Sequence, residues 1–135
     1  MKRLLDTNVI SDFVRGQQDV MQRLRHHAPG DLVISTISRM EVAYGLARQP
    51  ARAKRLAPLL DALFESIEVL SYAEDDAVET GKIRAELEVI GRPIGLCDAM
   101  LAGVARARGI LVVTRNVSEF SRVPGLRWEN WRDGA

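Results

Sequence analysis

Three carboxylic acids and one carboxamide in this sequence could together hold a divalent cation: Asp6, Glu41, Asp98 and Asn116. Carboxylates that share one cleft repel one another, and a divalent cation relieves that repulsion. A set of oxygen ligands suits Mg²⁺ or Mn²⁺ better than zinc. Such a cation can stabilise charge on phosphoryl oxygens and lower the pKa of an attacking water. The chemistry that these side chains predict is therefore metal-assisted hydrolysis of a phosphodiester.

Strands and helices are expected to alternate along the chain. Short apolar or β-branched runs predict strands at 2–5, 32–34, 67–70, 110–113 and, as a weaker case, 126–128. Apolar residues at helical spacing and helix-start signals predict helices at 6–14, 20–24, 38–46, 56–63, 73–90, 98–108 and 116–120. Pro58 lies inside one of these patterns and demands a kink or a fresh helix start. The alternation predicts an α/β fold, a parallel sheet of four to five strands with helices on both faces, in a single domain over 1–135.

Each candidate residue lies at the end of one of these elements. Asp6 and Asn116 directly follow expected strands, whereas Glu41 and Asp98 are expected to open helices. Right-handed crossovers bring the loops after parallel strands to one edge of the sheet, where ligands bind. We therefore expect the four side chains to share one cleft.

A purely structural role is also open for each residue taken alone. Asp6 could cap the helix that follows it. Ser38 and Glu41 have the spacing of a capping box, and so have Asn116 and Glu119. Capping would place polar residues at helix starts in any case, but it does not explain why all the candidates fall on one predicted edge.

The composition is that of an ordinary globular domain. Of the 135 residues, 47% are hydrophobic and 27% are charged, and the net charge of +1 is not that of a protein that binds nucleic acid by charge alone. No apolar run approaches the roughly 18 residues that a membrane-spanning helix needs, so no membrane association is expected. The single cysteine, Cys97, excludes an intrachain disulfide and favours a reducing, cytoplasmic location.

Six blocks of sequence follow one another at suitable spacing along nearly the whole chain: 5–8 (LDTN), 34–45, 80–87, 91–95, 98–103 and 113–120. In this order they resemble PIN domains, particularly the VapC-type toxins of toxin–antitoxin pairs. The short Asp-Thr-Asn motif alone would be a weak signal, whereas six ordered blocks are a strong one.

The resemblance implies an Mg²⁺- or Mn²⁺-dependent endoribonuclease that cuts RNA, with a tRNA and especially initiator tRNA as the expected substrate. It also implies a homodimer, silenced by a cognate antitoxin in a toxin–antitoxin hetero-oligomer. A different role remains open, that of a catalytically inactive PIN fold that binds RNA or serves in assembly. A receiver-like signalling domain would need a lysine after a late strand, but no lysine follows Lys82.

The resemblance also implies roles for single residues. Asp6, Glu41 and Asp98 would form the acidic metal cluster, and Asn116 would stand where many PIN domains carry a further acid. Supporting roles fall to other polar residues, with Thr7 and Thr114 as polar supports and Glu119 as an outer acid.

Three further features have simple interpretations. Arg84 could contact RNA or could pair with Glu88 on its own helix. Cys97 lies near a helix start, which can lower a thiol pKa, but a cysteine nucleophile would also need an oriented base. Trp128 and Trp131 are expected to pack at the C-terminal end.

Overall fold

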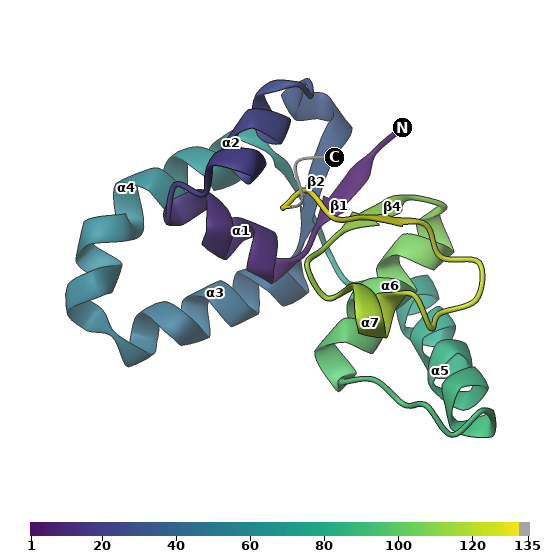
Figure 1. The fold of residues 1–135 in the computed structure, drawn as a ribbon. Coiled ribbons are helices and arrows are strands. Elements are labelled where there is room, and N and C mark those ends of the chain that lie inside the picture. The colour runs from purple at the N-terminus through teal and green to yellow at the C-terminus, as the bar shows by residue number, and fades with distance from the viewer. Residues whose placement is uncertain (133–135) are drawn as a thin grey trace.

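The described part of the chain, residues 1–132 of a computed structural model, is a parallel sheet between two layers of helices (Figure 1). The last three positions of the expected domain 1–135 lie outside the described residues. The strands are β1 (Arg3–Leu5), β2 (Leu32–Ser35), β3 (Glu68–Leu70), β4 (Leu111–Val113) and β5 (Trp128–Glu129). The helices are α1 (Thr7–Val14), α2 (Gln18–Arg25), α3 (Thr36–Arg48), α4 (Pro50–Ser66), α5 (Glu74–Val89), α6 (Leu96–Arg108) and α7 (Val117–Phe120), with a 3₁₀ turn at Pro29–Asp31.

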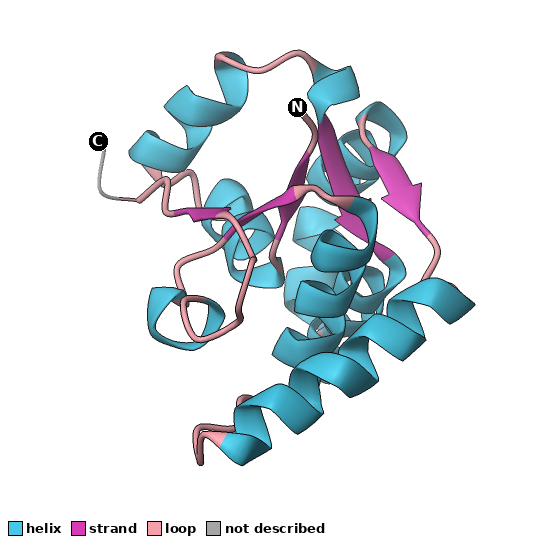
Figure 2. Ribbon diagram, turned by 90° about the vertical axis from the view of Figure 1, so that its right-hand side faces the viewer, coloured by secondary structure: helices cyan, strands magenta, loops and turns pink. Residues whose placement is uncertain are grey.

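The five strands lie in the order β3-β2-β1-β4-β5, and every neighbouring pair is parallel. The first strand of the chain is therefore the central one, with Arg3 opposite both Leu32 and Leu111. This arrangement confirms the predicted fold of a parallel sheet of four to five strands with helices on both faces (Figure 2).

Alternate residues of the central strands enter two separate cores, because successive side chains of a strand point to opposite faces. On one face, strand residues pack with α5, α6 and α7; the strand members of this core are Leu4, Val33 and Val112. On the other face, strand residues pack with α1, α2 and α4; the strand members of this core are Leu5, Leu32, Ile34, Leu111 and Val113. Burial on both sides explains why these strands are continuously apolar.

Two of the errors in the predicted helix starts concern the candidate site. Helix α3 begins at Thr36, and its N-cap is Ser35, whose hydroxyl accepts a hydrogen bond from the Ser38 backbone at 3.2 Å. Glu41 therefore lies in the second turn of α3, and the capping box predicted for it does not form. Helix α6 begins at Leu96, so Asp98 lies within its first turn instead of opening it.

Other predicted boundaries agree with the structure or differ slightly, except that the helix predicted at 56–63 runs from Pro50 to Ser66 as α4. Pro58 lies inside the single helix α4, so no fresh helix starts there, and Pro50 occupies the first turn instead. Gly109 ends α6 as predicted, with the positive φ of 66° that glycine adopts readily. Within residues 1–132, no helix has both the length and the apolar character needed to cross a membrane.

Candidate active site

An open pocket of about 300 Å³ lies at the edge of the sheet where β1 and β4 end. Its lining comprises Asp6, Thr7, Asn8, Ser11, Arg15, Glu41, Asp98 and Arg115. Three of the four predicted site residues thus share one pocket, although they come from α3, from α6 and from the end of β1. The fourth, Asn116, is not part of this lining but donates a hydrogen bond to Asp98.

Asp6 is the N-cap of α1 and at the same time a wall of the pocket. Its Oδ1 accepts a hydrogen bond from the Thr7 backbone at 2.7 Å, as the capping interpretation predicts. Its Oδ2 accepts hydrogen bonds from the Thr114 hydroxyl at 2.8 Å and from Asn8 at 3.2 Å. The residue is only 4% exposed. Burial raises the pKa of Asp6, and the nearby Glu41 adds to this, although the hydrogen bonds from Thr114 and Thr7 oppose it.

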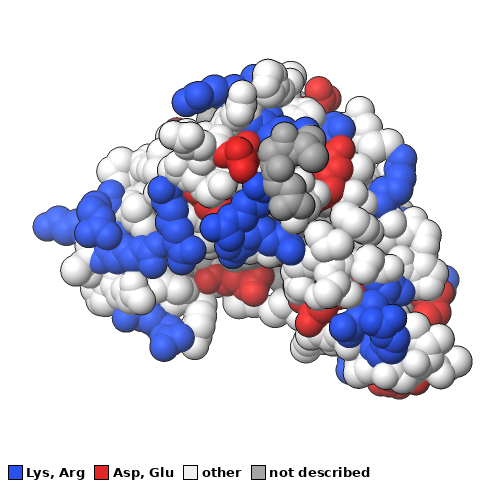
Figure 3. Space-filling model, viewed as in Figure 1, with Lys and Arg blue, Asp and Glu red and all other residues white. Residues whose placement is uncertain are grey.

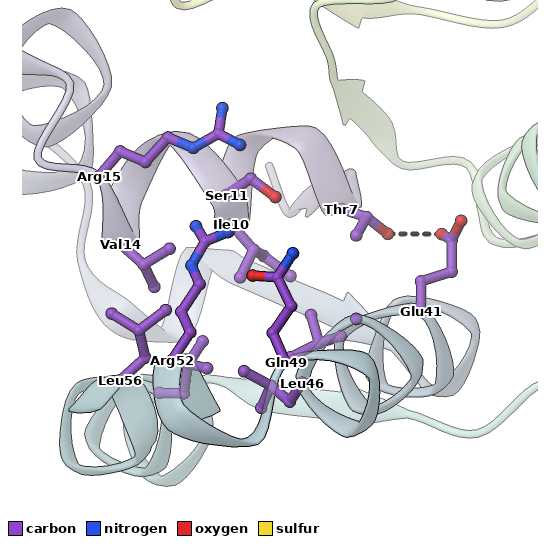
Figure 4. A pocket seen from close by; sticks show the side chains of 13 residues that line it. Thr7, Ile10, Ser11, Val14, Arg15, Glu41, Leu46, Gln49, Arg52 and Leu56 are labelled. Carbon is purple, nitrogen blue, oxygen red and sulfur yellow. Dashed lines mark hydrogen bonds between the residues drawn. The ribbon is translucent and has the colours of Figure 1, made fainter. Parts of the chain in front are cut away.

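Glu41 is held towards the pocket by Thr7. The Thr7 hydroxyl lies 2.6 Å from Glu41 Oε1 (Figure 4). It also lies 3.0 Å from the hydroxyl of Ser38. Since Thr7 starts α1 and Glu41 lies in α3, this contact fixes the two helices relative to each other at the site. Thr7 therefore lies where a polar support for the acids is expected.

Asp98 is the pocket residue whose pKa is shifted most strongly. Burial, a hydrogen bond with Glu119 and the charges of Asp6, Glu119 and Glu41 raise the pKa of Asp98 to about 8. The hydrogen bond with Asp98 lowers the pKa of Glu119 in turn. The closeness of the two carboxyl groups thus favours the protonated form of Asp98 and the ionised form of Glu119, because two adjacent negative charges are unfavourable in a partly desolvated site.

Asn116 serves Asp98 and does not cap its own helix. It occupies the N-cap position of α7, but its side chain makes no capping hydrogen bond there. Its Nδ2 instead donates to Asp98 Oδ2 at 2.9 Å. The capping pattern predicted for Asn116 and Glu119 is therefore wrong, and both side chains belong to the surroundings of Asp98.

Thr114 links the two halves of the site. Its fully buried hydroxyl donates to Asp6 and accepts from the backbone N–H of Asn116 at 2.9 Å. Asn8 adds a second link, because its amide nitrogen donates to Asp6 and its carbonyl oxygen accepts from the Arg115 backbone at 3.2 Å. The segment after β4 is thus fixed to the start of α1.

The chemistry of this donor set fits a hard divalent cation. The pocket offers carboxylate oxygens from three elements, and burial together with mutual repulsion raises the pKa of Asp6 and Asp98. A cation would relieve this repulsion and would favour the ionised form of Asp98. In their present rotamers, no three acidic, cysteine or histidine side chains of residues 1–132 converge closely enough to form a cluster for a metal. The pocket therefore suits a divalent cation in the type and charge of its ligands. The acidic side chains would have to change rotamer to contact a bound cation.

The structure brings together several residues that the sequence did not single out as site residues. Asn8, Arg15 and Arg115 line the pocket, and Asp12 pairs with Arg115 below its rim. Asn8 and Arg115 could have been found from the sequence, because they lie within the blocks 5–8 and 113–120 that carry the family resemblance. The sequence did not indicate a role for Asp12, because a polar residue on a helix is usually exposed to solvent.

Other highlighted residues lie away from the pocket or lack the expected property. Arg84 lies on α5 beside a small separate cavity of about 70 Å³, and no ion pair joins it to Glu88 in the described part of the chain. Burial and the charges of Glu41, Asp98 and Asp6 raise the pKa of the Cys97 thiol, so Cys97 is a poor nucleophile. Trp131 is buried as expected and stacks on His27 at 5.2 Å, whereas Trp128 is partly exposed.

A second, more apolar groove joins the acidic pocket. It runs between α1, α3 and α4, has a volume of about 180 Å³, and shares Thr7, Ser11, Arg15 and Glu41 with that pocket (Figure 4). Its apolar lining includes Ile10, Val14, Val42, Leu46, Leu56 and Leu60. On the face shown in Figure 3, Lys and Arg side chains gather over the α1–α4 side and Asp and Glu atoms lie next to them.

The chain is similar to known proteins over almost its full length. The family described as PIN domain matches residues 3–126. The tRNA(fMet)-specific endonuclease VapC of Shigella flexneri is 38% identical over 131 residues, which are 97% of this chain and 98% of that protein. The crystal structure of DNA-bound VapBC from Salmonella typhimurium contains a chain of 38% identity and TM-score 0.88, with 97% and 98% of the two chains covered. The structure of VapBC2 from Rickettsia felis bound to a promoter DNA fragment gives 28% identity and TM-score 0.89, with 97% and 99% covered.

Proposed function

The chain belongs to the PIN domain family, and from this premise we propose that it is a metal-dependent endoribonuclease that hydrolyses RNA phosphodiester bonds. The observation that carries this function is the single pocket lined by Asp6, Glu41 and Asp98, in which burial and repulsion raise the pKa of two of the acids. A tRNA, in particular initiator tRNA, is the proposed substrate, because the Shigella flexneri relative is named a tRNA(fMet)-specific endonuclease. We take the domain to extend over residues 1–135.

In the proposed mechanism Asp6, Glu41 and Asp98 hold Mg²⁺ or Mn²⁺. The bound cation would supply an activated water and neutralise charge on the phosphate. Thr7 keeps Glu41 turned towards the pocket, and Thr114 fixes Asp6. These contacts hold two of the three acidic groups in place before the substrate binds, which lowers the cost of assembling the reactive arrangement.

The surroundings of Asp98 complete the arrangement. Asn116 orients this carboxyl group through its amide, and Glu119 lies beside it as an outer acid that raises its pKa. Water, not a side chain, is the proposed nucleophile, because the pKa of the Cys97 thiol is raised. His26 and His27 stand at the far end of α2, so neither is placed as a base for Cys97.

Partners follow from the same family membership. Solved structures of relatives are VapBC complexes, so we propose a cognate antitoxin and, with it, a toxin–antitoxin hetero-oligomer built on a homodimer. The apolar groove between α1, α3 and α4 suits an amphipathic antitoxin helix. A cytoplasmic location is proposed from the tRNA substrate and the single free cysteine.

Cleavage of total tRNA by antitoxin-free protein tests this function. Wild type and Asp6→Asn are compared in Mg²⁺, Mn²⁺ and EDTA, with the exposed Asp75→Asn as a control for the same chemical change on α5. We expect wild type and Asp75→Asn to cut only with metal, and Asp6→Asn to lose at least a hundredfold in rate. Cleavage that survives EDTA and Asp6→Asn would overturn the metal-dependent function. RNA binding without any cleavage by folded, metal-loaded wild type would instead favour the inactive binding module.

A further inference from the structure

Three consecutive residues after β4 all serve the acidic pocket. Thr114 donates to Asp6 and Asn116 donates to Asp98, so each neighbour of Arg115 holds one of the acids. Arg115 itself lines the pocket and lies close enough to Asp6 to lower the pKa of that carboxyl group in part. A positive side chain is thus built into the wall of a site whose other charged groups are mainly acidic.

The position of Arg115 is fixed from two sides. Its backbone N–H donates to Asn8 Oδ1 at 3.2 Å. Its guanidinium nitrogen Nη1 lies 3.4 Å from Oδ1 of Asp12, whose side chain is only 1% exposed. A buried carboxylate is unfavourable unless it is paired, so Asp12 holds the guanidinium against α1.

This ion pair leaves most of the guanidinium available for another ligand. Asp12 is the only acidic group within 4.0 Å of it among residues 1–132, and the contact is long and uses one nitrogen. The second Asp12 oxygen, Oδ2, has no hydrogen-bond partner in the same part of the chain. A guanidinium carries five N–H donors, and 31% of the Arg115 side chain remains exposed.

The negative charge of the pocket makes a positive group such as the Arg115 guanidinium favourable when RNA binds. Asp6, Glu41 and Asp98 carry up to three negative charges, and one divalent cation offsets two of them. An RNA phosphate brings a further negative charge to the same place. An arginine is suited to accept it, because its planar fork binds phosphate oxygens in pairs.

Building on the proposed nuclease function, we propose that Arg115 binds an RNA phosphate next to the scissile bond and that Asp12 is the positioning residue that holds it there. A purely structural role, in which Arg115 only neutralises Asp12, makes a different prediction. It requires a loss of stability on substitution but no change in how RNA binding depends on salt.

The salt dependence of RNA binding separates these two roles. Binding of a fluorescein-labelled initiator tRNA transcript is measured by anisotropy in EDTA, which prevents cleavage, over a series of salt concentrations. Loss of one phosphate contact reduces the slope of log K against log salt by about 0.7–0.9. For Arg115→Gln we expect this smaller slope, together with roughly tenfold weaker binding at moderate salt.

Matched variants control for charge and for stability. Arg127→Gln removes the same charge from an exposed arginine that contacts Gly109, at the opposite end of β4, and should keep the wild-type slope. Asp12→Asn/Arg115→Gln removes both charges, so its thermal stability should exceed that of Arg115→Gln while its slope stays reduced. Arg115→Lys should keep the wild-type slope, since it keeps the charge, but recover only part of the affinity, since it lacks the fork.

Cleavage by wild type, measured in parallel with Mg²⁺, distinguishes the possible failures. If wild type cleaves tRNA but Arg115→Gln and the double variant bind RNA with the wild-type slope and affinity, the role of Arg115 is overturned and the nuclease function stands. If wild type binds RNA but does not cleave it, the nuclease function fails, and the slopes still decide whether Arg115 contacts phosphate. If wild type neither binds nor cleaves, both are overturned.

Discussion

The amide nitrogen of Asn116 lies 2.9 Å from Oδ2 of Asp98 and donates a hydrogen bond to it. The amide therefore orients the carboxyl group without adding a negative charge to the pocket. A carboxylate at position 116 would have to be compensated by a cation or a proton, because Asp98 and Glu119 already form a close pair of acids in which the pKa of Asp98 is raised.

Asn116→Asp should make the metal-free protein less stable and more dependent on metal. The change removes a donor to Asp98 and adds a like charge, so we expect the free energy of unfolding in EDTA to fall by about 1–3 kcal/mol. Added Mn²⁺ should recover more stability in this variant than in wild type. Thermal unfolding with and without Mn²⁺ measures both effects, with exposed Gln22→Glu as the charge-matched control. Equal stability of Asn116→Asp and wild type in EDTA would contradict the role assigned to the amide.

Metal should stabilise the folded chain through Asp98. A ligand that binds only the native state at a hundred times its Kd adds about 2.7 kcal/mol of stability. We expect Mn²⁺ or Mg²⁺ to raise the Tm of wild type, and Asp98→Asn to abolish the rise. Calorimetry checks this, with exposed Asp75→Asn, which should respond like wild type. A full metal response in Asp98→Asn would remove Asp98 from the ligand set.

The pair of Arg108 and Asp76 should control stability in acid. Arg108 contacts both oxygens of Asp76, at 3.2 and 2.9 Å, and the Asp76 side chain is only 2% exposed. Burial alone would raise the pKa of Asp76, but the hydrogen bonds from Arg108 and from the Ala73 backbone outweigh it and lower the pKa below its ordinary value of 3.8. This contribution to stability is therefore present above the ordinary value and lost as the pH falls through the lower, folded-state value.

Arg108→Gln should thus lower the free energy of unfolding at neutral pH. It should also make that free energy depend less on pH in acid. Arg108 is itself partly exposed, so removing it from the buried Asp76 should cost about 1–3 kcal/mol, the cost of a buried acceptor left without its donor. Urea unfolding at neutral pH and at about pH 3 measures the difference in free energy of unfolding between wild type and Arg108→Gln. This difference should be smaller in acid, where Asp76 begins to protonate in the variant. Exposed Arg92→Gln is the control for loss of an arginine. An equal loss at both pH values would contradict the assignment.

Gly103 should tolerate no side chain, whereas Gly81 should. A Cβ at Gly103 would collide with the Thr80 hydroxyl and lie 2.9 Å from the Asp76 carbonyl oxygen, because α5 and α6 pack closely there. We expect Gly103→Ala to lower the free energy of unfolding by about 1–3 kcal/mol. A Cβ at Gly81, on α5, meets nothing within 4 Å, so Gly81→Ala should stabilise by about 0.5–1 kcal/mol. Chemical denaturation of both variants checks the pair, and a stabilised Gly103→Ala would contradict this packing.

The fold was predictable because its strands are buried on both faces. The apolar runs of β2 and β4 and the helical spacing between them predict the alternation and, with it, the parallel sheet. Element starts were less predictable, since Ser35 and Ser38 are both good N-caps and only the three-dimensional course of the chain selects the first. Thr36 and Ile37 are β-branched and gave no helix signal, yet both are helical.

The site was predictable only in part. The edge shared by Asp6, Glu41 and Asp98 follows from topology, because parallel strands end on one side. The partners of the side chains do not follow from local patterns. Asp12 reads as an ordinary polar residue of a helix, yet it is buried and pairs with Arg115, a residue about a hundred positions away. Asn116 fits a capping motif but bonds to another helix.

The central place of β1 has a consequence for synthesis of the chain on the ribosome. Leu5 pairs with Val113, and Asp6 accepts a hydrogen bond from Thr114. The first residues translated can therefore complete these contacts only after some of the last have been synthesised. At about 5–20 residues per second, several seconds separate the two segments. A nascent or prematurely terminated polypeptide that lacks β4 has neither a complete sheet nor a complete pocket. The ordering of the strands thus keeps the growing polypeptide inert until translation of this domain is nearly finished.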